Sequence, residues 1–324
     1  MIAYLTGRLA QTVVVVVLVT TIAFFLIHAA PGDPFGAAME NPKVTEAVRA
    51  QWRASYGLDR PLPEQFVKYI ASVARGDLGW SFSRQRPVAA VLKETLPNTL
   101  LLMSVALVAS FILGIFLAVL QAMKPKSLTD KIIGGISLFL FSMPEFWLAL
   151  MALFLLAYHF PVFPIGGMRD EVMHSSYGFG GRVADILRHT VLPALTLTLL
   201  YSAVVARYQR AALLDALPAE YIKTARAKGV TEKSIVRRHA LRNALLPIIT
   251  LFGLAFPALL TGAVFVEKVF AWPGMGGVIV SSIDSRDYPL LVASVIIGSV
   301  LVAFGSLIAD LLYRVADPRL RDDH

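Results

Sequence analysis

Hydrophobic residues in this chain gather into six long stretches that carry almost no charge. A helix needs about 20 residues to cross the roughly 30 Å of hydrocarbon in a bilayer, and the stretches are close to that length or beyond it. The pattern therefore predicts six membrane-spanning helices. They lie at about residues 9–29, 98–123 and 132–158, and between residues 188 and 207, 242 and 267, and 287 and 314.

Composition favours a membrane protein over a soluble enzyme, a disordered chain or a fibre. Hydrophobic residues make up 56% of the 324 residues and charged residues 16%, whereas a soluble domain carries about a quarter charged residues. The first stretch also resembles a signal peptide, but it is longer than the usual apolar core of about 7–15 residues. The chain has no Cys, which excludes disulfides and thiolate metal sites.

The distribution of charge predicts how the chain is oriented. Cytoplasmic loops of membrane proteins are enriched in Lys and Arg. Residues 207–242 carry nine Lys or Arg against three acidic residues, a net charge of +6, and residues 124–131 and the C-terminal tail are also basic. We therefore expect these segments and both termini in the cytoplasm. The overall net charge of +8 then reflects topology, and no nucleic-acid partner is expected.

Residues 31–94 are predicted to form an external segment, because they are polar and interrupted by Pro and Gly. Apolar residues recur at helical spacing over Val44–Trp52 and Phe66–Val73, which predicts two short amphipathic helices. The segment either caps the outer helix ends or docks an external partner. We expect two parts, residues 1–96 with the first span and this segment, and residues 97–324 with the other five spans.

The basic loop, residues 215–247, is the most informative polar segment. Pro218 suits the first turn of a helix, where its missing N–H costs nothing, and the pattern predicts a helix over residues 217–228. Gly229 is placed to end this helix in a left-handed conformation. Thr231 is placed to cap a second helix that continues into the fifth span. The sequence therefore predicts a protruding helix–turn–helix.

Within the basic loop, Tyr221 and the run Thr224–Gly229 resemble the EAA loop of permease subunits of binding-protein-dependent ABC importers. More narrowly, YIKTARAKG followed by RHALRNALLP is similar to the first permease of the dipeptide, oligopeptide and nickel class. The resemblance covers the whole chain, including GDP at 32–34, YGLDRPLPEQFVKYI at 56–70, GDLGWSF at 76–82, LPNTL at 96–100, VFVEKVFAWPGMG at 264–276, RDYPL at 286–290 and DPRLR at 317–321.

This resemblance implies the fold of a type I ABC importer permease: an all-α polytopic protein with six transmembrane helices and cytoplasmic termini, in a prokaryotic inner membrane. Two departures from the general motif concern the register of its turn. The Leu-Pro pair stands later than in the motif, at Leu246-Pro247, and Lys223-Thr224 replaces Glu-Ala, with Glu220 further upstream.

The resemblance also implies a coupling role for the basic loop. Its first helix would sit in a cleft of a cytoplasmic ATPase subunit, through Glu220, Tyr221, Thr224, Ala225, Arg226, Ala227, Lys228 and Gly229. Ala225 and Ala227 would allow close approach, and Arg226 and Lys228 would pair with acidic groups of that subunit. The alternative is that the basic loop contacts anionic lipid headgroups.

The partners implied by the resemblance are two ATPase subunits, a homologous second permease and an external solute-binding protein, within a lipid bilayer. Trp52 and Trp272 are candidates for docking the binding protein, and Trp272 is alternatively an interfacial anchor. The chain has no G-x-x-x-x-G-K-[ST] motif. ATP and Mg are therefore expected on the ATPase subunits, and this chain is expected to bind no cofactor and to catalyse no reaction.

Glu145 is expected near the middle of the third span, beside Pro144, which should kink the helix. Because a charge inside the bilayer is costly, Glu145 either lines the translocation path near cationic solute groups, or bonds to backbone groups or a neighbouring helix. The candidates for the translocation path are Ser142, Glu145, Phe146, Thr250, Pro257 and Thr261.

Other polar and small residues have mostly structural interpretations. Asp310 and Arg314 are spaced to form an ion pair on one helix face. Gly253 and Gly262 are typical of close helix packing. The histidines, including His174 and His189, show no metal-ligand spacing.

The sequence therefore favours an importer permease for peptides or similar small solutes. Nickel chelates, glutathione and oligosaccharides are alternative cargoes. A stand-alone secondary transporter is the less favoured reading, because we find no internal inverted repeat. A membrane enzyme is disfavoured because the sequence has neither HExxH nor G-x-S-x-G.

Overall fold

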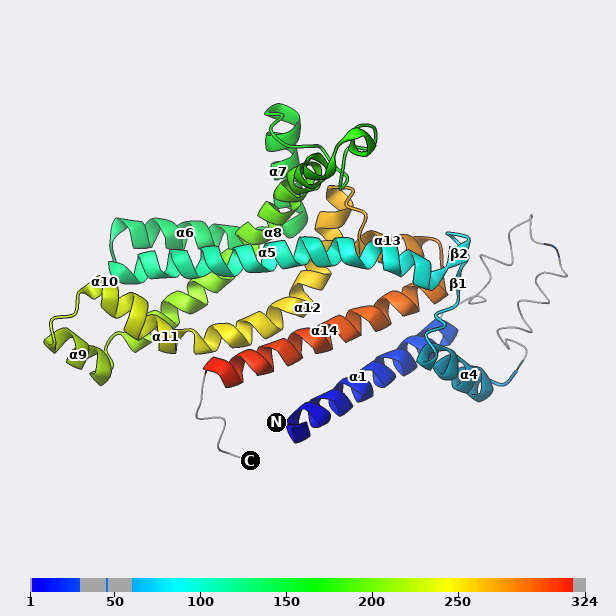
Figure 1. Ribbon diagram of the computed structural model, residues 1–324, viewed down its shortest axis with the longest axis horizontal. Helices are drawn as coiled ribbons and strands as arrows, with labels where there is room; N and C mark the ends of the chain where they lie inside the picture. Colours follow the sequence, from blue (N-terminus) through cyan, green and yellow to red (C-terminus); the bar gives the residue numbers. More distant parts are fainter. Residues whose placement is uncertain (1, 30–44, 46–59, 317–324) are drawn as a thin grey trace. The chain divides into compact units, whose positions relative to one another are not determined.

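The computed structural model describes residues 2–29, 45 and 60–316 (Figure 1). Side-chain positions are described for all of these except residues 2–5, 8, 9, 27, 256–262 and 313–316. The predicted helix over Val44–Trp52 lies outside the described residues, apart from residue 45. The docking prediction for Trp52 therefore stays a prediction.

The described residues form helices and one small hairpin. In chain order the elements are α1 (Ile2–Ala29), α4 (Leu62–Ala74), β1 (Trp80–Ser81), β2 (Arg86–Pro87), α5 (Val88–Met123), α6 (Leu128–Ser142), α7 (Glu145–Leu153), the π-helical turn η1 (Phe154–His159), the 3-10 turn η2 (His174–Ser176), α8 (Phe179–Ala216), α9 (Glu220–Ala227), α10 (Glu232–Ser234), the π-helical turn η3 (Ile235–Ala240), α11 (Leu241–Ala244), α12 (Leu246–Val269), α13 (Met275–Asp284) and α14 (Tyr288–Ala316). The short helix predicted over Phe66–Val73 is confirmed as part of α4.

Three helices in the described part of the chain are long and apolar enough to cross a membrane: α5, α8 and α14 as far as Leu312. The helices on either side of Pro144 would together make a fourth, bent span. The described apolar parts of α1 and α12, Ala10–Leu26 and Leu246–Ala255, are shorter than the 18 residues of such a helix. Length and composition thus support three or four spans, and six spans stay a prediction.

The predicted third span is two helices rather than one kinked helix. α6 ends at Ser142, α7 begins at Glu145, and the two helical segments meet at 104°. Met143 and Pro144 between them are extended, with ψ of 136° and 133°. The cause is local, because Pro lacks the N–H for a helical hydrogen bond and its ring disfavours helical conformation in the preceding residue.

The predicted fourth span is the middle of a much longer helix. The charges at Arg188 and Arg207 bounded the prediction, but α8 has 38 residues and continues to Ala216. These charges indicate a change in surroundings and do not interrupt helical hydrogen bonding. The residues after Arg207 include Ala, Leu, Gln and Arg, which are good helix formers. The extension carries α8 directly to the basic loop.

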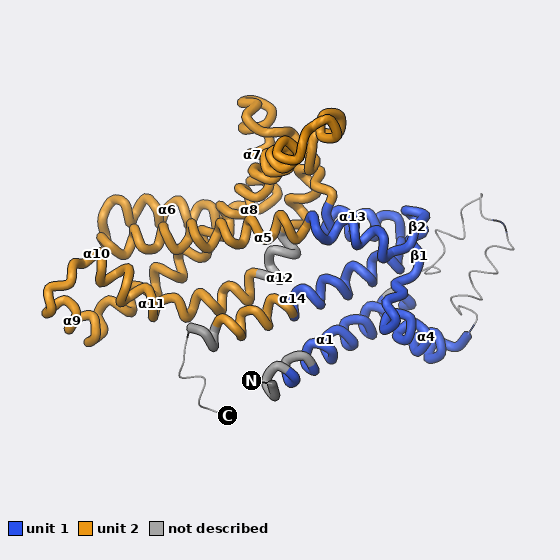
Figure 2. Tube along the Cα trace, viewed as in Figure 1, with its two compact units in different colours: residues 1–98, 274–303 blue, residues 99–273, 304–324 orange. Residues whose placement is uncertain are grey.

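The chain divides into two compact units (Figure 2). Unit 1 consists of residues 1–98 and 274–303, and unit 2 of residues 99–273 and 304–324. In unit 1, Phe24 of α1 packs against Phe66 and Tyr69 of α4. A second apolar cluster joins the start of α5 to α13 and α14, through Val88, Val91, Leu92, Met275, Val278, Leu290 and Ala293.

The buried carboxylate of Asp287 joins the hairpin segment of unit 1 to the start of α14. Asp287 stands just before α14 and accepts a hydrogen bond from the N–H of Leu290 at 3.3 Å, which caps the helix. It also accepts hydrogen bonds from the hydroxyls of Ser81 and Ser83, each at 2.6 Å. Two segments 206 residues apart are thereby joined.

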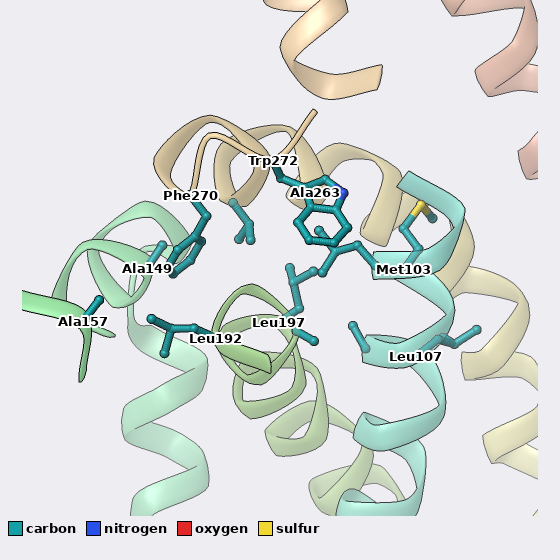
Figure 3. Close-up of a cluster of buried hydrophobic side chains, with 13 residues drawn as sticks. Met103, Leu107, Ala149, Ala157, Leu192, Leu197, Ala263, Phe270 and Trp272 are labelled. Atoms are coloured by element: carbon teal, nitrogen blue, oxygen red, sulfur yellow. The ribbon is translucent and has the colours of Figure 1, made fainter. Parts of the chain in front are cut away.

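The core of unit 2 lies among α5, α7, α8 and α12 (Figure 3). It contains Leu102, Met103, Leu107, Leu192, Leu197, Val266, Phe270 and Trp272, with five Ala residues. Trp272 is only 2% exposed, and this burial argues against both of its predicted surface roles. The short, apolar turn that carries it folds inward because the indole offers a large apolar area to bury.

Small residues let the helices of unit 2 approach closely. A Cβ added at Gly114 of α5 would lie 2.6 Å from Cβ of Val205 on α8, and one at Gly253 of α12 would lie 2.7 Å from Cβ of Ala309 on α14. The close-packing role predicted for Gly253 is therefore confirmed. The side-chain surroundings of Gly262 lie outside the described residues.

Candidate functional site

The first helix of the basic loop is α9, and it ends in the predicted left-handed turn. Gly229 has φ of +78°, which confirms the prediction for that residue. Its N–H donates to the carbonyl of Arg226, and the N–H of Val230 donates to the carbonyl of Ala225, at 3.0 and 3.3 Å. This is the Schellman arrangement, which satisfies two carbonyls that the helix end leaves free. The helix is shorter than predicted, because it begins at Glu220.

The chain then turns back into a second helical segment. Thr231 occupies the N-cap position of α10 as predicted, but its side chain makes no capping hydrogen bond. Arg226 closes the turn instead, with Nε 2.6 Å from Oε1 of Glu232 and Nη2 3.1 Å from Oε2. These hydrogen bonds lower the pKa of Glu232 and raise that of Arg226. Helical turns then lead through η3 and α11 into α12.

One face of the basic loop is buried in unit 2. Ile222 of α9 is 0% exposed. It belongs to an apolar cluster with Ala118, Val119 and Ala122 of α5, Leu213 of α8, Ala225 of α9, Ile235, Val236 and Ala240 of η3, and Ala244 of α11. The basic loop is therefore attached along its length to the ends of α5 and α8.

The opposite face of α9 is exposed. Of the predicted coupling residues, Ala225 packs inward, whereas the other seven are exposed: Glu220, Tyr221, Thr224, Arg226, Ala227, Lys228 and Gly229. Arg226 is paired within the loop, and Lys223 pairs with Glu220 at 2.7 Å. Lys228 makes no ion pair with the described residues. Of the two cations predicted to take part in coupling, Lys228 is therefore the one without a partner inside the loop.

Glu145 begins α7, immediately after the 104° break. Its Oε1 atom is buried and has no hydrogen-bond partner among the described residues. Tyr201 of α8 is close enough for electrostatic interaction with the carboxylate. The sequence left open that Glu145 bonds to a neighbouring helix or to free backbone groups. The structure shows no such hydrogen bond for Oε1 among the described residues.

The structure describes the side chains of three of the other five translocation-path candidates, and the path itself stays a prediction. Ser142 is exposed, and its hydroxyl donates to the carbonyl of Leu138 in its own helix at 2.9 Å. Phe146 and Thr250 are also exposed. The side chains of Pro257 and Thr261 lie outside the described residues, as does that of Arg314. The predicted pair between Asp310 and Arg314 therefore stays a prediction.

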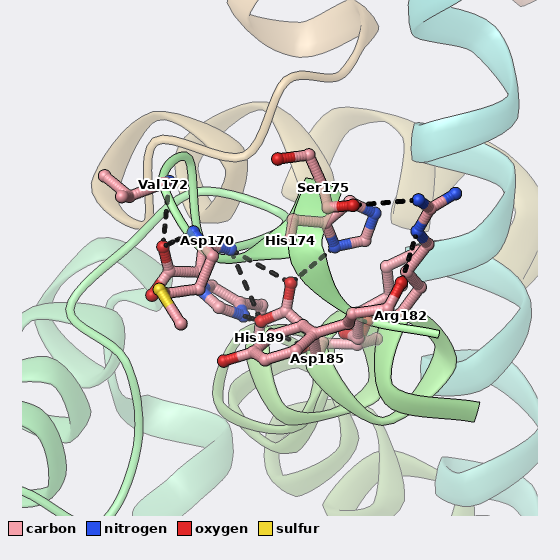
Figure 4. Close-up of polar contacts among 11 residues, drawn as sticks. Asp170, Val172, His174, Ser175, Arg182, Asp185 and His189 are labelled. Carbon is pink, nitrogen blue, oxygen red and sulfur yellow. Dashed lines mark hydrogen bonds and ion pairs between the residues drawn. The ribbon is translucent and has the colours of Figure 1, made fainter. Parts of the chain in front are cut away.

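His174 of η2 and His189 of α8 share the carboxylate of Asp185, which also belongs to α8 (Figure 4). Nδ1 of His174 is 2.6 Å from Oδ2 of Asp185, and Nδ1 of His189 is 3.1 Å from Oδ1. The N–H of Asp170 also donates to Asp185. Backbone N–H groups of Met173 and Val172 lower the pKa of Asp170. No group of three or more side chains that could hold a metal ion occurs within the described ranges. The hydrogen bonds to Asp185 join the segment that contains Asp170 and His174 to α8.

Sequence reasoning missed a polar cluster beside the basic loop. Asp130 of α6 is buried and forms two hydrogen bonds with Arg210 of α8, at 2.7 and 2.8 Å. The neighbouring Gln209 donates to the carbonyl of Ala244 at 3.1 Å. The sequence interpretation counted Asp130 and Arg210 only as loop charges. Because the two residues are 80 positions apart, no local sequence pattern predicts that they form a pair.

Two family profiles match this chain. Residues 110–322 match "Binding-protein-dependent transport system inner membrane component", and residues 1–103 match its N-terminal counterpart. The chain belongs to this permease family. As a member of that family it is an integral membrane subunit of a bacterial ABC transporter, and the family assignment made from the basic loop is confirmed.

Several relatives of this permease align over nearly their whole length. It is 39% identical over 321 residues to the oligopeptide transport system permease protein AppB of Bacillus subtilis (strain 168). It is 33% identical over 336 residues to the dipeptide transport system permease protein DppB of Escherichia coli (strain K12), and 34% identical over 333 residues to the di/tripeptide permease DppB of Pseudomonas aeruginosa (strain UCBPP-PA14). Each alignment covers 99% of both chains.

The turn at Gly229 gives a direct test of the basic loop in this permease. Gly229→Pro fixes φ at about −65° and removes an N–H, so it abolishes the Schellman turn. Solute uptake and stimulation of ATPase activity should both be lost. Gly229→Ala introduces strain of about 1–2 kcal/mol, but a Cβ there has open space, so most of both activities should remain.

Gly76 provides the matched control. It also has positive φ, and its N–H closes the same kind of turn after α4, donating to the carbonyl of Val73 at 2.9 Å. Gly76→Pro should leave ATPase stimulation intact. Wild-type uptake and stimulation in Gly229→Pro would refute the coupling role of the basic loop.

Proposed function

We propose that this chain is the permease subunit of an ATP-driven importer and forms half of the translocation path for peptides or similar small solutes. The observation that carries the proposal is the alignment over nearly full length with permeases named for oligopeptide and dipeptide transport. An external binding protein delivers the solute. Nickel chelates, glutathione and oligosaccharides are the alternative cargoes.

The proposed architecture has six membrane spans with both termini in the cytoplasm of a prokaryotic cell, in its inner membrane. The six apolar stretches and the basic segments between them support this topology. Residues 1–96 supply the first span and the external segment, and residues 97–324 supply the five-helix core with the basic loop. In this topology, the basic loop faces the cytoplasm.

Coupling to ATP hydrolysis is proposed to act through the exposed face of α9. Tyr221, Thr224, Ala227 and Lys228 are exposed there, while Ile222 and Ala225 hold the opposite face to the chain's own helices. A partner that moves α9 would therefore also move the ends of α5 and α8. Two ATPase subunits, which bind the ATP and Mg, are the proposed partners.

The second permease and the lipid would cover the exposed apolar faces. α6 exposes Leu128, Ile132, Ile136, Leu138, Phe139 and Phe141. Apolar patches of this kind are covered in a working membrane protein by lipid or by another subunit. A six-helix bundle alone is a narrow conduit for a peptide, so the path is proposed to lie between two homologous permeases.

Glu145 is proposed to face the path and to attract cationic groups of the solute. The support is its buried oxygen without a described hydrogen-bond partner, at a point where the backbone is irregular. Irregular backbone at membrane depth is tolerated where protein buries it or where it lines a water-filled cavity. A peptide's protonated amino group is a partner of the right charge.

Reconstitution tests the proposed function. The complex of this chain with its second permease and ATPase subunits, placed in liposomes with the binding protein and a labelled peptide, should accumulate peptide only when ATP is supplied. Leaving out the ATPase subunits should abolish uphill uptake. Uphill uptake by this chain alone, driven by an ion gradient, would contradict the proposal and favour a secondary transporter.

Substitution of Glu145 tests the solute path. Glu145→Gln removes the charge but keeps the size, so uptake of peptides with an extra positive charge should fall by about tenfold relative to neutral peptides, since a hydrogen bond to a charged group contributes about 1.5–3 kcal/mol. Competition uptake across a set of peptides of different charge provides the measurement. Glu171→Gln, which removes the charge of an exposed glutamate, is the control and should leave the charge preference unchanged. An unchanged charge preference in Glu145→Gln removes the solute role.

A further inference from the structure

We propose that Gln209 and Arg210 of α8, held by Asp130, form a clamp that makes the basic loop and the ends of α5, α6 and α8 move as one body. This inference rests on the proposed function, because it concerns how motion of the basic loop reaches the helices. The residues named are positioning residues, since they contact neither solute nor nucleotide.

Arg210 and Asp130 join α8 to α6. Nε and Nη2 of Arg210 donate to the two carboxylate oxygens of Asp130 at 2.7 and 2.8 Å. Two parallel hydrogen bonds between planar groups fix orientation as well as distance. The guanidinium of Arg207 also lies 4.9 Å from the ring centroid of Phe141, close to the C-terminal end of α6. α6 is thus held to α8 at two points, one near each of its ends.

The same carboxylate also holds α5 and the turn before α6. Gln121 of α5 donates to Oδ1 of Asp130 at 3.0 Å and to its carbonyl at 3.2 Å. The N–H of Lys126, which has φ of +66°, donates to Oδ2 at 2.9 Å. Because Asp130 is buried, each hydrogen bond that it loses leaves a costly unpaired group.

Gln209 joins α8 to the returning arm of the basic loop. Its side chain is 0% exposed, and Nε2 donates to the carbonyl of Ala244 in α11 at 3.1 Å. Its Oε1 has no hydrogen-bond partner among the described residues. A buried amide oxygen without a partner costs stability, so the hydrogen bond from Nε2 to Ala244 is the contact that this side chain contributes.

Two adjacent residues of α8 therefore hold two different neighbouring segments. Gln209 holds α11 and Arg210 holds α6, while the apolar cluster around Leu213, one helical turn further on, holds α9. A helix is stiff over such a short distance. If an ATPase subunit displaced the basic loop, α6 would therefore move with the basic loop by the same amount.

Transport per ATP hydrolysed in the complete reconstituted complex tests the clamp. Arg210→Gln, Asp130→Asn and the double variant should each keep the ATPase subunits bound, but solute moved per ATP should fall by about fivefold or more, the lower end of typical coupling between distant sites. The double variant should lose no more than either single variant. Arg86→Gln is the matched control, since it breaks an exposed pair of similar geometry with Glu94, at 2.9 and 2.6 Å.

The outcomes separate this inference from the proposed function. A wild-type complex without ATP-driven uptake overturns both. If the wild type shows ATP-driven uptake and Arg210→Gln moves as much solute per ATP hydrolysed as the wild type, the clamp alone is overturned. An equal loss in Arg86→Gln also overturns it, because the effect would then not be specific to α8.

A distance measurement does not depend on transport. The chain has no Cys, so spin labels can be placed at Lys233→Cys in the basic loop and Lys131→Cys in α6, both exposed. In the complete complex, the distance between the labels should be the same with and without ATP, and should shift or broaden in Arg210→Gln. A wild-type distance that changes with nucleotide overturns the proposal.

Discussion

Burial of Ile222 and its neighbours against α5 and α8 is the interaction on which the rest of the account depends. A basic segment of this length would otherwise be a solvated arm. Full burial of one large aliphatic side chain stabilises by about 1.5–3 kcal/mol, and here α8, α9, η3 and α11 all contribute to one cluster. The basic loop is thereby a structured extension of the membrane helices, with one face left for a partner. The Schellman turn at Gly229 and the Arg226–Glu232 pair shape that face.

The break at Pro144 is the second constraint. A continuous helix satisfies nearly all of its own backbone hydrogen bonds, which hydrocarbon requires. Both α5 and α14 are unbroken over the described residues, although α5 contains Pro97. The chain departs from this continuity where α6 and α7 meet at 104°. The acidic Glu145 stands at that departure. An irregular backbone and an ionisable side chain at one place are both costly in lipid, and their coincidence favours a functional explanation.

Much of the secondary structure follows from local sequence, and much of the site does not. The apolar stretches predict α5 and α14, and Gly229 predicts the end of α9, because both depend on neighbouring residues. The size of the bend at Pro144 depends on packing that no local pattern encodes. The burial of Trp272 and the meeting of Asp130 with Arg210 depend on contacts across 80 residues or more. The resemblance to a permease family supplied the functional assignment, which the spacing of charges alone would have left divided between a partner protein and lipid.

Cross-linking from the exposed face of α9 tests most directly whether the basic loop is where the ATPase engages. Lys228→Cys introduces the one thiol of the chain, since the sequence has no Cys, and a short bifunctional reagent is applied to the intact, transporting complex. The account predicts a cross-link to an ATPase subunit from residue 228 and none from Glu171→Cys, in the segment between α7 and α8. No cross-link from residue 228 in a complex that still couples ATP hydrolysis to uptake would contradict it.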